Sequence, residues 1–352
     1  MDNQKKYGIR EIAKRANVSI GTVDRVIHKR KGVSDKTRLK ILDIIKELDY
    51  QPNVLASRLA SKKVYRIGVL IPSASKETDF WNAPITGMKR AEEEIKQYGV
   101  DICYFFFQLE SRDSFLAQIK LLRKKDVHGV ILSPLFKDDA TQFVVDCKSK
   151  NLPVVYIDSY LQNQKTLSYI GFNLNDSGKQ VAQLFDFCLN KSDKILIANI
   201  SWEIDDFHIE RGFRSYFTEK GYSRNIIKVD IPHTDLSSIR KQLESLLEIE
   251  KDIRGVFVTN SRVNIVAKYM EDIGRGDIFI IGYDLTKDNL KYLKNGSIHF
   301  LICHKPEFQG YLAVMTFYQY LVLGEEIKEM QYMPIDILTK QNYGYYQIGT
   351  KL

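Results

Sequence analysis

Side chains able to bind a ligand are concentrated in two parts of this 352-residue sequence. The stretch VSIGTVDRVIHKRKGVSDKTR (residues 18–38) combines hydroxyl groups and cations at short spacing. Such groups suit the phosphates and base edges of nucleic acids. Further along, Asp158, Asn260, Asp284 and His304 each end an apolar run. Acids and amides at such places suit a hydroxyl-rich ligand, because each can make two hydrogen bonds, although helix capping is the common alternative.

Catalytic chemistry is not indicated by any motif. The sequence has no G-x-S-x-G, P-loop or H-E-x-x-H motif, and no G-x-G-x-x-G after a predicted strand. The four cysteines, at positions 103, 147, 188 and 303, form no C-x-x-C pair, and the six histidines are scattered. We therefore expect no metal, no cofactor and no enzymatic activity. Carboxylates facing a cleft could still do acid–base work, which is the remaining enzymatic alternative.

Positive charge is confined to the N-terminal part of the chain. Residues 1–63 carry 16 Lys and Arg against 7 Asp and Glu, a net charge of +9, whereas the remaining residues carry 36 against 37, a net charge of −1. This asymmetry favours a nucleic-acid partner for the first segment, the alternative being a basic face without a partner. No apolar run of 18 residues and no secretory signal is present, so we expect a cytoplasmic protein.

Three short helices are expected over residues 9–48. Ser19 and Ser34 suit the N-caps of the second and third helices, because a serine hydroxyl accepts from an otherwise unsatisfied backbone N–H. The expected apolar faces consist of Ile9, Ile12, Ala13 and Ala16, then Val23, Val26 and Ile27, then Leu39, Leu42, Ile45 and Leu48. Two short helices joined by a tight turn and supported by a third match a helix-turn-helix unit. An ordinary three-helix bundle has the same periodicity, so spacing alone leaves both interpretations open.

The order of residues favours the first interpretation. Residues 8–61 contain A-x-x-A-x-V-S-x-x-T-V-x-R-V, then V-S-x-x-T-R, then L-x-Y-x-P-N. This segment closely resembles the DNA-binding headpiece of the LacI family of bacterial transcription regulators. The resemblance implies a headpiece over residues 1–50 and a hinge helix with its linker over residues 51–63, with Leu59 wedged into the minor groove. The DNA-contacting residues that it implies are Ser19, Ile20, Gly21, Thr22, Asp24, Arg25, His28, Ser34, Thr37, Arg38, Asn53, Ala56, Leu59 and Ala60.

Two of these positions depart from the family pattern. Gly21 removes a side chain from a place that usually reads a base, and Asp24 stands where the family more often has serine. A carboxylate can accept a hydrogen bond from cytosine N4. We therefore expect an operator preference that differs from those of relatives, with the same mode of binding.

After residue 63 the pattern changes to ten apolar runs, most of them separated by helical patterns. Alternation of this kind predicts parallel sheets covered by helices on both faces. Ten strands favour two lobes, each a doubly wound parallel sheet, so the expected fold is α/β after a small all-α headpiece. The runs are residues 65–72, 100–107, 128–134, 152–158, 167–173, 194–201, 226–232, 254–260, 278–284 and 298–304.

This larger part resembles the periplasmic-binding-protein-like effector domain of the same family, most of all its ribose-binding type. GYDLTKDNL (282–290) and CHKPEFQGYLA (303–313) carry the likeness. The resemblance implies an effector and dimerisation domain over residues 64–352. One lobe would hold about 64–170 and 304–330, and the other about 171–303 and 331–352.

The resemblance also implies which side chains meet the effector. The effector-binding residues are expected to be Phe80, Trp81, Asp158, His208, Arg211, Asn260, Asp284 and His304. The two aromatic residues would stack on the ligand. Ile209 stands where an arginine is usual, with His208 and Arg211 as candidate substitutes, and His304 replaces a usual glutamine. We therefore expect a sugar or sugar derivative other than a plain pentose.

The expected function is that of an effector-responsive transcription regulator. A homodimer would place two recognition helices in successive major grooves of a pseudo-palindromic operator. A small carbohydrate-like effector between the lobes would then control operator affinity. The alternatives are a DNA-binding regulator with a degenerate pocket, and a solute-binding module without gene control.

Overall fold

The structure is a computed structural model that describes residues 8–27, 30–50, 63–75, 79–201, 207–232 and 235–349. Contacts divide the chain into two compact units, residues 1–62 and residues 63–352. Among the described residues, no helix is long and apolar enough to cross a membrane. The hinge expected at residues 51–63 lies, apart from Lys63, outside the described part of the chain.

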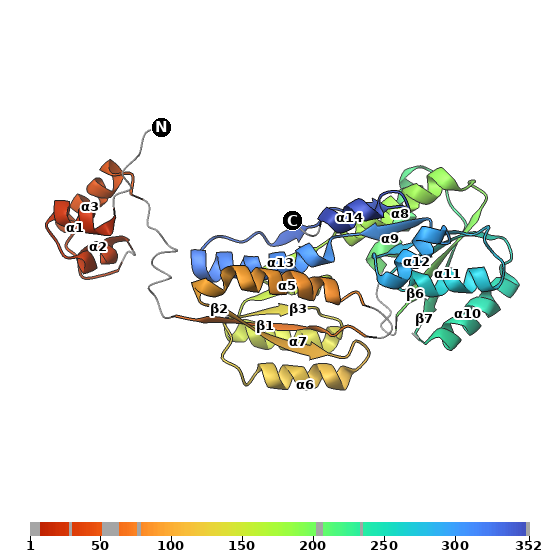
Figure 1. The fold of residues 1–352 in the computed structure, drawn as a ribbon, viewed down its shortest axis with the longest axis horizontal. Coiled ribbons are helices and arrows are strands. Elements are labelled where there is room, and N and C mark those ends of the chain that lie inside the picture. The colour runs from red at the N-terminus through yellow and green to blue at the C-terminus, as the bar shows by residue number, and fades with distance from the viewer. Residues whose placement is uncertain are drawn as a thin grey trace. The chain divides into compact units, whose positions relative to one another are not determined.

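The first unit has three helices in its described part, as Figure 1 shows: α1 (Ile9–Ala16), α2 (Ile20–Ile27) and α3 (Asp35–Glu47). The amide of Thr22 donates to the Ser19 hydroxyl over 3.2 Å, and the amide of Thr37 donates to the Ser34 hydroxyl over 3.4 Å. Both predicted N-caps are therefore confirmed, and they fix where α2 and α3 begin.

The core of the first unit confirms the predicted faces of the first two helices and corrects that of the third. Leu39 is 62% exposed and Leu42 is 45% exposed, although both were expected in the core. Ile41 and Ile44 are buried in their place. Together with Ile45 and Leu48 they form the complete i, i+3, i+4, i+7 stripe that a helix buries. The buried core residues are Ile12, Ala13, Ala16, Val23, Val26, Ile41 and Ile44.

The second unit contains two six-stranded sheets, one in each lobe. The strand order is β11-β5-β4-β3-β1-β2 in the first lobe and β12-β10-β9-β8-β6-β7 in the second. Only the β10–β12 pair is antiparallel among the described pairs. All ten predicted runs form strands, and the predicted fold class is confirmed. The strands are β1 (Tyr65–Pro72), β2 (Val100–Phe107), β3 (Gly129–Leu132), β4 (Val154–Ile157), β5 (Ser168–Gly171), β6 (Lys194–Ile200), β7 (Ile226–Ile231), β8 (Ile253–Val258), β9 (Phe279–Tyr283), β10 (Phe300–Cys303), β11 (Met330–Tyr332) and β12 (Asp336–Leu338).

Helices cover both faces of each sheet (Figure 1). In the first lobe α5 and α13 lie opposite α6 and α7, and in the second α8 and α9 lie opposite α10, α11 and α12. This arrangement buries near-continuous apolar strands on both sides. The helices are α5 (Asn82–Ile95), α6 (Arg112–Leu122), α7 (Lys137–Ser149), α8 (Leu174–Cys188), α9 (Phe207–Glu219), α10 (Leu236–Ile249), α11 (Val263–Asp272), α12 (Lys287–Asn295), α13 (Pro306–Phe317) and α14 (Tyr343–Gly349), with a 3-10 turn at Lys96–Tyr98 and a π-helical segment at Tyr318–Leu323.

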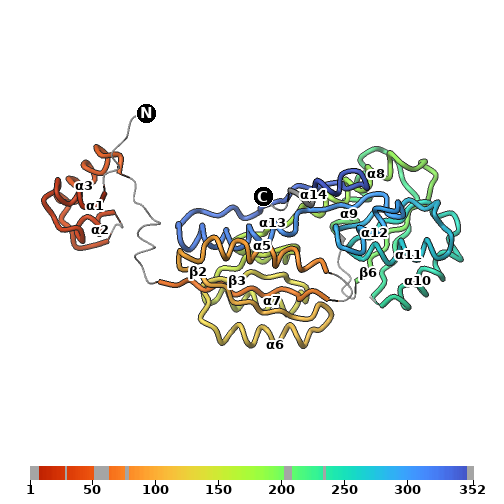
Figure 2. Tube along the Cα trace, in the orientation of Figure 1, coloured from red at the N-terminus to blue at the C-terminus, as the bar shows by residue number. Residues whose placement is uncertain are grey.

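The chain passes between the lobes three times. It leaves the first lobe after β5, returns in α13, which packs beside α5, and leaves again between β11 and β12, as the trace in Figure 2 shows. The last passage lies a few residues beyond the boundary expected at residue 330, because Met330–Tyr332 pairs with β5 of the first sheet. Strand ends and helix starts from both lobes thus meet at the passages.

Glycines let the paired helices of each lobe pack closely. A Cβ atom added at Gly87 of α5 would lie 1.8 Å from the carbonyl oxygen of Glu307 in α13. In the second lobe, a Cβ atom at Gly178 of α8 would lie 2.0 Å from the carbonyl oxygen of Ile209 in α9. A larger side chain would force either pair apart. The second contact fixes the first turn of α9.

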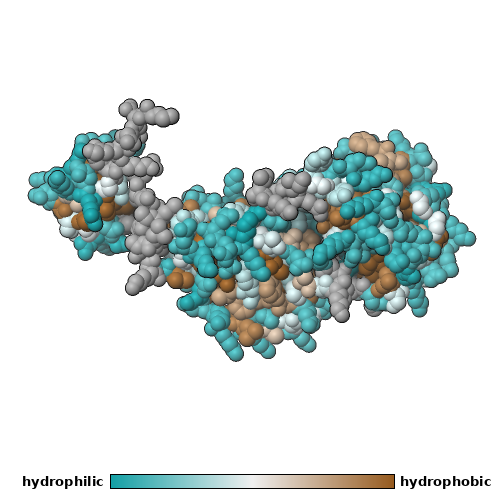
Figure 3. Space-filling view, viewed as in Figure 1, coloured by the Kyte–Doolittle hydropathy of each residue, from teal (hydrophilic) through white to brown (hydrophobic). Residues whose placement is uncertain are grey.

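Most of the surface turned toward the viewer in Figure 3 is hydrophilic. Hydrophobic atoms gather on the first lobe near β2 and α6, where Phe106 is 37% exposed and Leu121 is 49% exposed. β2 forms one end of its sheet. The apolar atoms there are consequently not covered by a further strand of the described chain.

Candidate functional site

The outer face of α2, from its first turn to Arg25 in its last turn, is an exposed surface of mixed character. Ile20 is 47% exposed, and Gly21 and Arg25 are also exposed. Val23 and Val26 of the same helix pack into the core. The helix therefore keeps its N-terminal residues available on the outside, as a recognition helix in a major groove requires.

Asp24 is held by a neighbour on this surface. Arg30 Nη1 donates to the Asp24 carboxylate over 3.1 Å, and Arg38 Nη2 donates to the carbonyl oxygen of Arg30 over 3.2 Å. Arg30, which the sequence analysis did not single out, thus joins two residues expected at the DNA. The Asp24–Arg30 pair is exposed, so it contributes about 0–1 kcal/mol and can yield to a base or a phosphate.

The hydroxyl groups expected at the DNA pair with each other at the helix starts. The Ser19 and Thr22 hydroxyl oxygens lie 2.9 Å apart, and those of Ser34 and Thr37 lie 2.8 Å apart. Each pair keeps its hydroxyls at the N-terminus of a helix, where a phosphate is favoured. The other expected DNA-contacting residues, His28, Asn53, Ala56, Leu59 and Ala60, lie outside the described residues.

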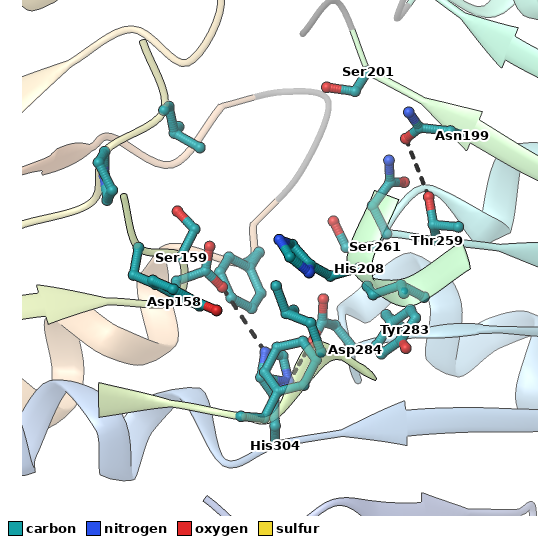
Figure 4. Close-up of a pocket in the computed structure, with 18 of the residues that line it drawn as sticks. Asp158, Ser159, Asn199, Ser201, His208, Thr259, Ser261, Tyr283, Asp284 and His304 are labelled. Atoms are coloured by element: carbon teal, nitrogen blue, oxygen red, sulfur yellow. Dashed lines mark hydrogen bonds and ion pairs between the residues drawn. The ribbon is translucent and has the colours of Figure 1, made fainter. Parts of the chain in front are cut away.

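The second unit holds a cavity of about 740 Å³ that side chains of both lobes line. It brings together all eight residues expected at the effector, from positions that are far apart in the sequence. They are Phe80, Trp81, Asp158, His208, Arg211, Asn260, Asp284 and His304. Figure 4 shows Asp158 and Ser159 approaching from one side and Asp284 and Tyr283 from the other.

Two aspartates enter the cavity from strand ends with an uncommon backbone conformation. Asp158 follows β4 with a φ of 70°, and Asp284 follows β9 with a φ of 68°. Such left-handed conformations are uncommon outside glycine, although Asp tolerates them better than most residues. The equivalent turn in each lobe aims a carboxylate at the space between the lobes, where ligands of parallel sheets bind.

His304 lies between these two carboxylates, and we call the three residues the acid–histidine group (Figure 4). Its Nδ1 is 3.4 Å from Asp284 Oδ1, and its Nε2 is 3.9 Å from Asp158 Oδ1. Burial raises the pKa of Asp158 to about 7 and lowers the pKa of His304 to about 3. Burial and then the charge of Asp158 raise the pKa of Asp284 well above its usual value. The imidazole is therefore neutral at pH 7, so one ring nitrogen can donate a hydrogen bond and the other can accept one.

Aromatic rings surround the acid–histidine group. The Phe172 ring centre lies 4.0 Å from that of His304 at 70°, and the Phe80 ring is nearly parallel to His304 at 6.3 Å. Trp81 meets Phe80 edge to face at 5.2 Å. Phe172 and Tyr283, both in the cavity wall, were not predicted. Each stands one residue before the end of an apolar run, so only the alternation of buried and cavity-facing residues could have signalled them.

Asn260 lines the cavity but uses its side chain to hold the backbone. Its Nδ2 donates to the carbonyl oxygen of Ile200 over 2.7 Å, and its Oδ1 accepts from the amide of Arg262 over 3.1 Å. Both polar ends are thus bonded to backbone beside the start of α11. Backbone hydrogen bonds explain Asn260, whereas the acid–histidine group has no such explanation.

A second polar group lines the cavity at the ends of β6 and β8 and was not foreseen. The Thr259 hydroxyl donates to Asn199 Oδ1 over 3.1 Å, and Asn199 Nδ2 donates to Asp230 over 3.2 Å. Ser201 and Ser261 lie on the same side (Figure 4). Polar residues that end strand runs were the available signal. The cavity therefore offers hydrogen-bonding groups beyond those of the acid–histidine group.

The first turn of α9 supplies a guanidinium group, from Arg211, and an imidazole, from His208. Arg211 Nη2 lies 3.4 Å from His208 Nδ1, and Gln162 of the first lobe contacts the other ring nitrogen of His208. Burial, then the charges of Arg211 and Lys137, lower the pKa of His208. Ile209, between them in sequence, is buried and contributes an apolar surface to the wall.

Contacts between the lobes lie beside the cavity. Arg262 Nη2 of the second lobe lies 3.4 Å from Glu110 Oε1 of the first lobe. Gln162 of the first lobe likewise contacts His208 of the second lobe. Arg262 also donates from Nη1 to the carbonyl oxygen of Ile200 over 3.3 Å. Within the part of the chain that the structure describes, no cluster of His, Cys, Asp and Glu could hold a metal ion.

Comparison with known proteins accounts for both units. Residues 8–53 match the family model for bacterial regulatory proteins of the lacI family, and residues 67–326 match the model for a periplasmic binding protein domain. The chain belongs to the LacI family of bacterial regulators. This LacI-family chain is a DNA-binding transcription regulator with a helix-turn-helix unit and a periplasmic-binding-protein domain, as its sequence predicted.

Relatives of similar length share this LacI-family arrangement. The ribose operon repressor of Halalkalibacterium halodurans is 29% identical over 286 residues, which cover 78% of this chain and 80% of that protein. Catabolite control protein A of Priestia megaterium is 26% identical over 285 residues, covering 79% and 82%. Among solved structures, GanP, a glucose-galactose binding protein from Geobacillus stearothermophilus, has a TM-score of 0.72 at 21% identity, covering 80% of this chain and 99% of that one. The last similarity shows the fold alone.

Proposed function

We propose that this regulator works as a homodimer, holds a carbohydrate effector in the cavity between its lobes, and binds a pseudo-palindromic operator through α2 of each copy. A two-fold symmetric dimer presents two recognition helices to the two halves of such a site. The regulator acts in the cytoplasm, and it needs no catalytic residue, metal or cofactor.

One observation carries the effector assignment. Asp284 Oδ1 and both ring nitrogens of His304 are buried and make no hydrogen bond within the described residues, although they line a cavity. A buried polar atom without a hydrogen bond costs about 1–3 kcal/mol. Hydroxyl groups both donate and accept, so a hydroxyl-rich ligand would satisfy all three atoms. A sugar ring also has apolar faces that fit against Phe80 and Phe172.

The contacts between the lobes suggest how the effector acts on the operator. Glu110–Arg262 and Gln162–His208 join opposite sides of the cavity. A ligand that bonds to both lobes stabilises the arrangement in which these contacts form. Coupling between the two sites is then the difference in operator affinity between the two arrangements, typically 1–3 kcal/mol. A relative named as a ribose operon repressor supports a sugar in this role.

The effector assignment is tested by thermal unfolding of the full chain with a panel of neutral and charged monosaccharides. At least one sugar should raise the midpoint of unfolding, and Asp284→Asn should lower its affinity at least tenfold, because an amide nitrogen replaces one of the two carboxyl oxygens that meet the ligand. Asn tolerates the positive φ at this position. Asp288→Asn is the matched control, because Asp288 is exposed and does not line the cavity. The assignment fails if no sugar shifts the midpoint, or if Asp284→Asn binds like the wild type.

A further inference from the structure

The two carboxyl groups of the acid–histidine group face the cavity without a positive partner. Among the described residues, His304 is the only basic side chain within 4 Å of either carboxyl group. Its lowered pKa keeps the imidazole neutral at pH 7. Asp284 Oδ1 is buried and makes no hydrogen bond within the same residues. The pair therefore lacks the cation that buried carboxylates normally have.

Acids elsewhere in the second unit are paired with cations. Glu210 of α9 lies 2.7 Å from Arg214 and 3.1 Å from Lys228. Arg275 lies 2.8 Å from Asp277, and this hydrogen bond lowers the pKa of Asp277. The two aspartates of the cavity depart from this pattern.

Burial and like charge oppose the ionisation of both cavity acids. Burial alone raises the pKa of Asp158, and burial followed by the charge of Asp158 raises the pKa of Asp284. The two acids come from different lobes, Asp158 after β4 and Asp284 after β9. Two carboxylates in one space repel each other unless a cation lies near them. A cationic ligand would allow both groups to ionise and would replace this repulsion by attraction between each lobe and the ligand.

Aromatic rings complete the chemistry of an ammonium site. The ring centres of Phe80, Phe172 and Tyr283 lie 6.3, 4.0 and 6.5 Å from that of His304. The face of an aromatic ring carries partial negative charge and attracts a cation. Carboxylates add charge-assisted hydrogen bonds to the same cation. Acids and rings of this kind thus suit an organic ammonium group.

The arginines of the cavity wall meet other groups. Arg262 Nη1 donates to the carbonyl oxygen of Ile200 over 3.3 Å, and its Nη2 lies 3.4 Å from Glu110 Oε1. Arg211 Nη2 lies 3.4 Å from His208 Nδ1. Each guanidinium thus has a neighbour outside the acid–histidine group, and neither supplies the cation that its carboxyl groups lack.

We propose that the effector carries a positively charged amino group and is an amino sugar. Its ammonium group lies close to Asp158, Asp284 and the neighbouring rings, and its hydroxyl groups bond to His304 and to the polar group of Asn199 and Thr259. The ligand is attracted to an acid of each lobe, so it favours the arrangement in which the lobes are joined. This inference rests on the proposed function, because it names the chemical class of effector for the same cavity.

Isothermal titration of the full-length protein at neutral pH tests the charge of the effector. The probes are glucosamine, galactosamine, mannosamine and 6-amino-6-deoxyglucose, each with its neutral parent sugar, together with N-acetylglucosamine and methylammonium chloride. At least one amino sugar should bind about tenfold more tightly than its parent, because hydrogen bonds between charged groups are stronger than those between neutral groups. N-Acetylglucosamine keeps the nitrogen but loses the charge, so it should bind no more tightly than glucose.

Variants of the two acids give the second readout. Asp158→Asn and Asp284→Asn should each lower the preference for the amino sugar over its neutral parent about tenfold, because each removes a negative charge and keeps the size of the side chain. Asn tolerates the positive φ of both positions. Asp288→Asn removes the same charge from an exposed residue outside the cavity and should keep the wild-type preference.

Three outcomes would overturn the inference. Neutral parents that bind as tightly as their amino sugars, or cavity variants that keep the preference of Asp288→Asn, refute the amino sugar but keep the proposed function. Methylammonium that binds as tightly as every amino sugar refutes a sugar as the carrier of the charge. If no probe of either charge binds, the inference and the carbohydrate assignment both fail.

Discussion

The two units assemble their ligand-facing residues in opposite ways. In the first unit, the described residues expected at the DNA come from one stretch, residues 18–38, and lie on exposed helix starts. In the second unit, the residues expected at the effector run from Phe80 to His304 and meet because strand ends and helix starts of two separate lobes line one cavity. A DNA-reading surface can thus be built from local sequence, whereas the cavity depends on the whole topology.

The two regions also differ in how they hold their charges. The Asp24–Arg30 pair of the first unit is in water, where a partner can be exchanged at little cost. The acid–histidine group is buried, where polar interactions are stronger and an unsatisfied atom is costly. The first arrangement suits a surface that binds and releases DNA, and the second suits discrimination among small ligands.

The largest effect is expected from a substitution that disrupts the packing of the second unit and leaves the first unit unchanged. Gly178→Ala places a methyl group against the backbone of Ile209 and should destabilise the second unit by about 3 kcal/mol. Urea unfolding followed by tryptophan fluorescence reports this unit alone, because both tryptophans, Trp81 and Trp202, lie in it. Gly276→Ala, where an added Cβ meets nothing within 4 Å, is the control and should change little. Equal stability of the two variants would contradict the packing described for α8 and α9.

A change on the recognition helix should act on DNA alone. Arg25→Ala should weaken operator binding by about 1–3 kcal/mol, the usual cost of losing one specific contact. Lys46→Ala is the control, because it removes the same charge from an exposed position in the last turn of α3. Fluorescence anisotropy with the operator and with random DNA measures both variants. Equal losses for Arg25→Ala and Lys46→Ala on the operator would show that α2 does not read bases.

The buried acids predict a pH dependence specific to the second unit. Folding raises the pKa of Asp158 to about 7, so the folded state holds a proton that the unfolded chain releases at lower pH. The free energy of unfolding should therefore fall as pH rises from about 4 to about 7 on account of this group. Asp158→Asn removes that contribution, a difference of about 2–3 kcal/mol between pH 5 and pH 8. Both proteins keep His304, so its opposite contribution cancels in the comparison; parallel pH profiles would contradict the assignment.

The smallest effect is expected at the exposed ion pair. Asp24→Ser should change the preference for a C-rich half-site by less than about 1 kcal/mol, because the carboxylate already receives a hydrogen bond from Arg30. Asp43→Ser, an exposed acid on α3, serves as the control. Competition binding with half-sites that differ at a single base pair measures the preference. An unchanged base preference would show that Asp24 only positions Arg30.

The sequence predicted most of the fold, because the decisive patterns are local. Ten apolar runs separated by helical patterns predict two parallel sheets, and serine before each helix predicts where α2 and α3 begin. The face of α3 was partly wrong, since Leu39 and Leu42 fit one helical stripe and Ile41 and Ile44 fit a better one. A choice between two such stripes is made by the neighbouring helices.

The cavity was predicted less completely, because its contacts join distant positions. Asp284 and His304 were predicted from strand ends and from the family resemblance. The Thr259–Asn199 bond and the Glu110–Arg262 contact link residues far apart in sequence, and no local pattern marks them. Whether a strand-end side chain bonds to backbone or faces a ligand also depends on what surrounds it, as Asn260 illustrates.

The central claim, that the cavity controls the DNA-binding unit, is tested most directly by measuring operator affinity with and without a sugar that binds. Fluorescence anisotropy of the wild type should change by about 5- to 150-fold on adding saturating sugar, in either direction. The same sugar concentration should leave the operator affinity of Asp284→Asn much closer to its sugar-free value. Operator affinity that ignores a bound sugar in the wild type, or responds equally in Asp284→Asn, would contradict the claim.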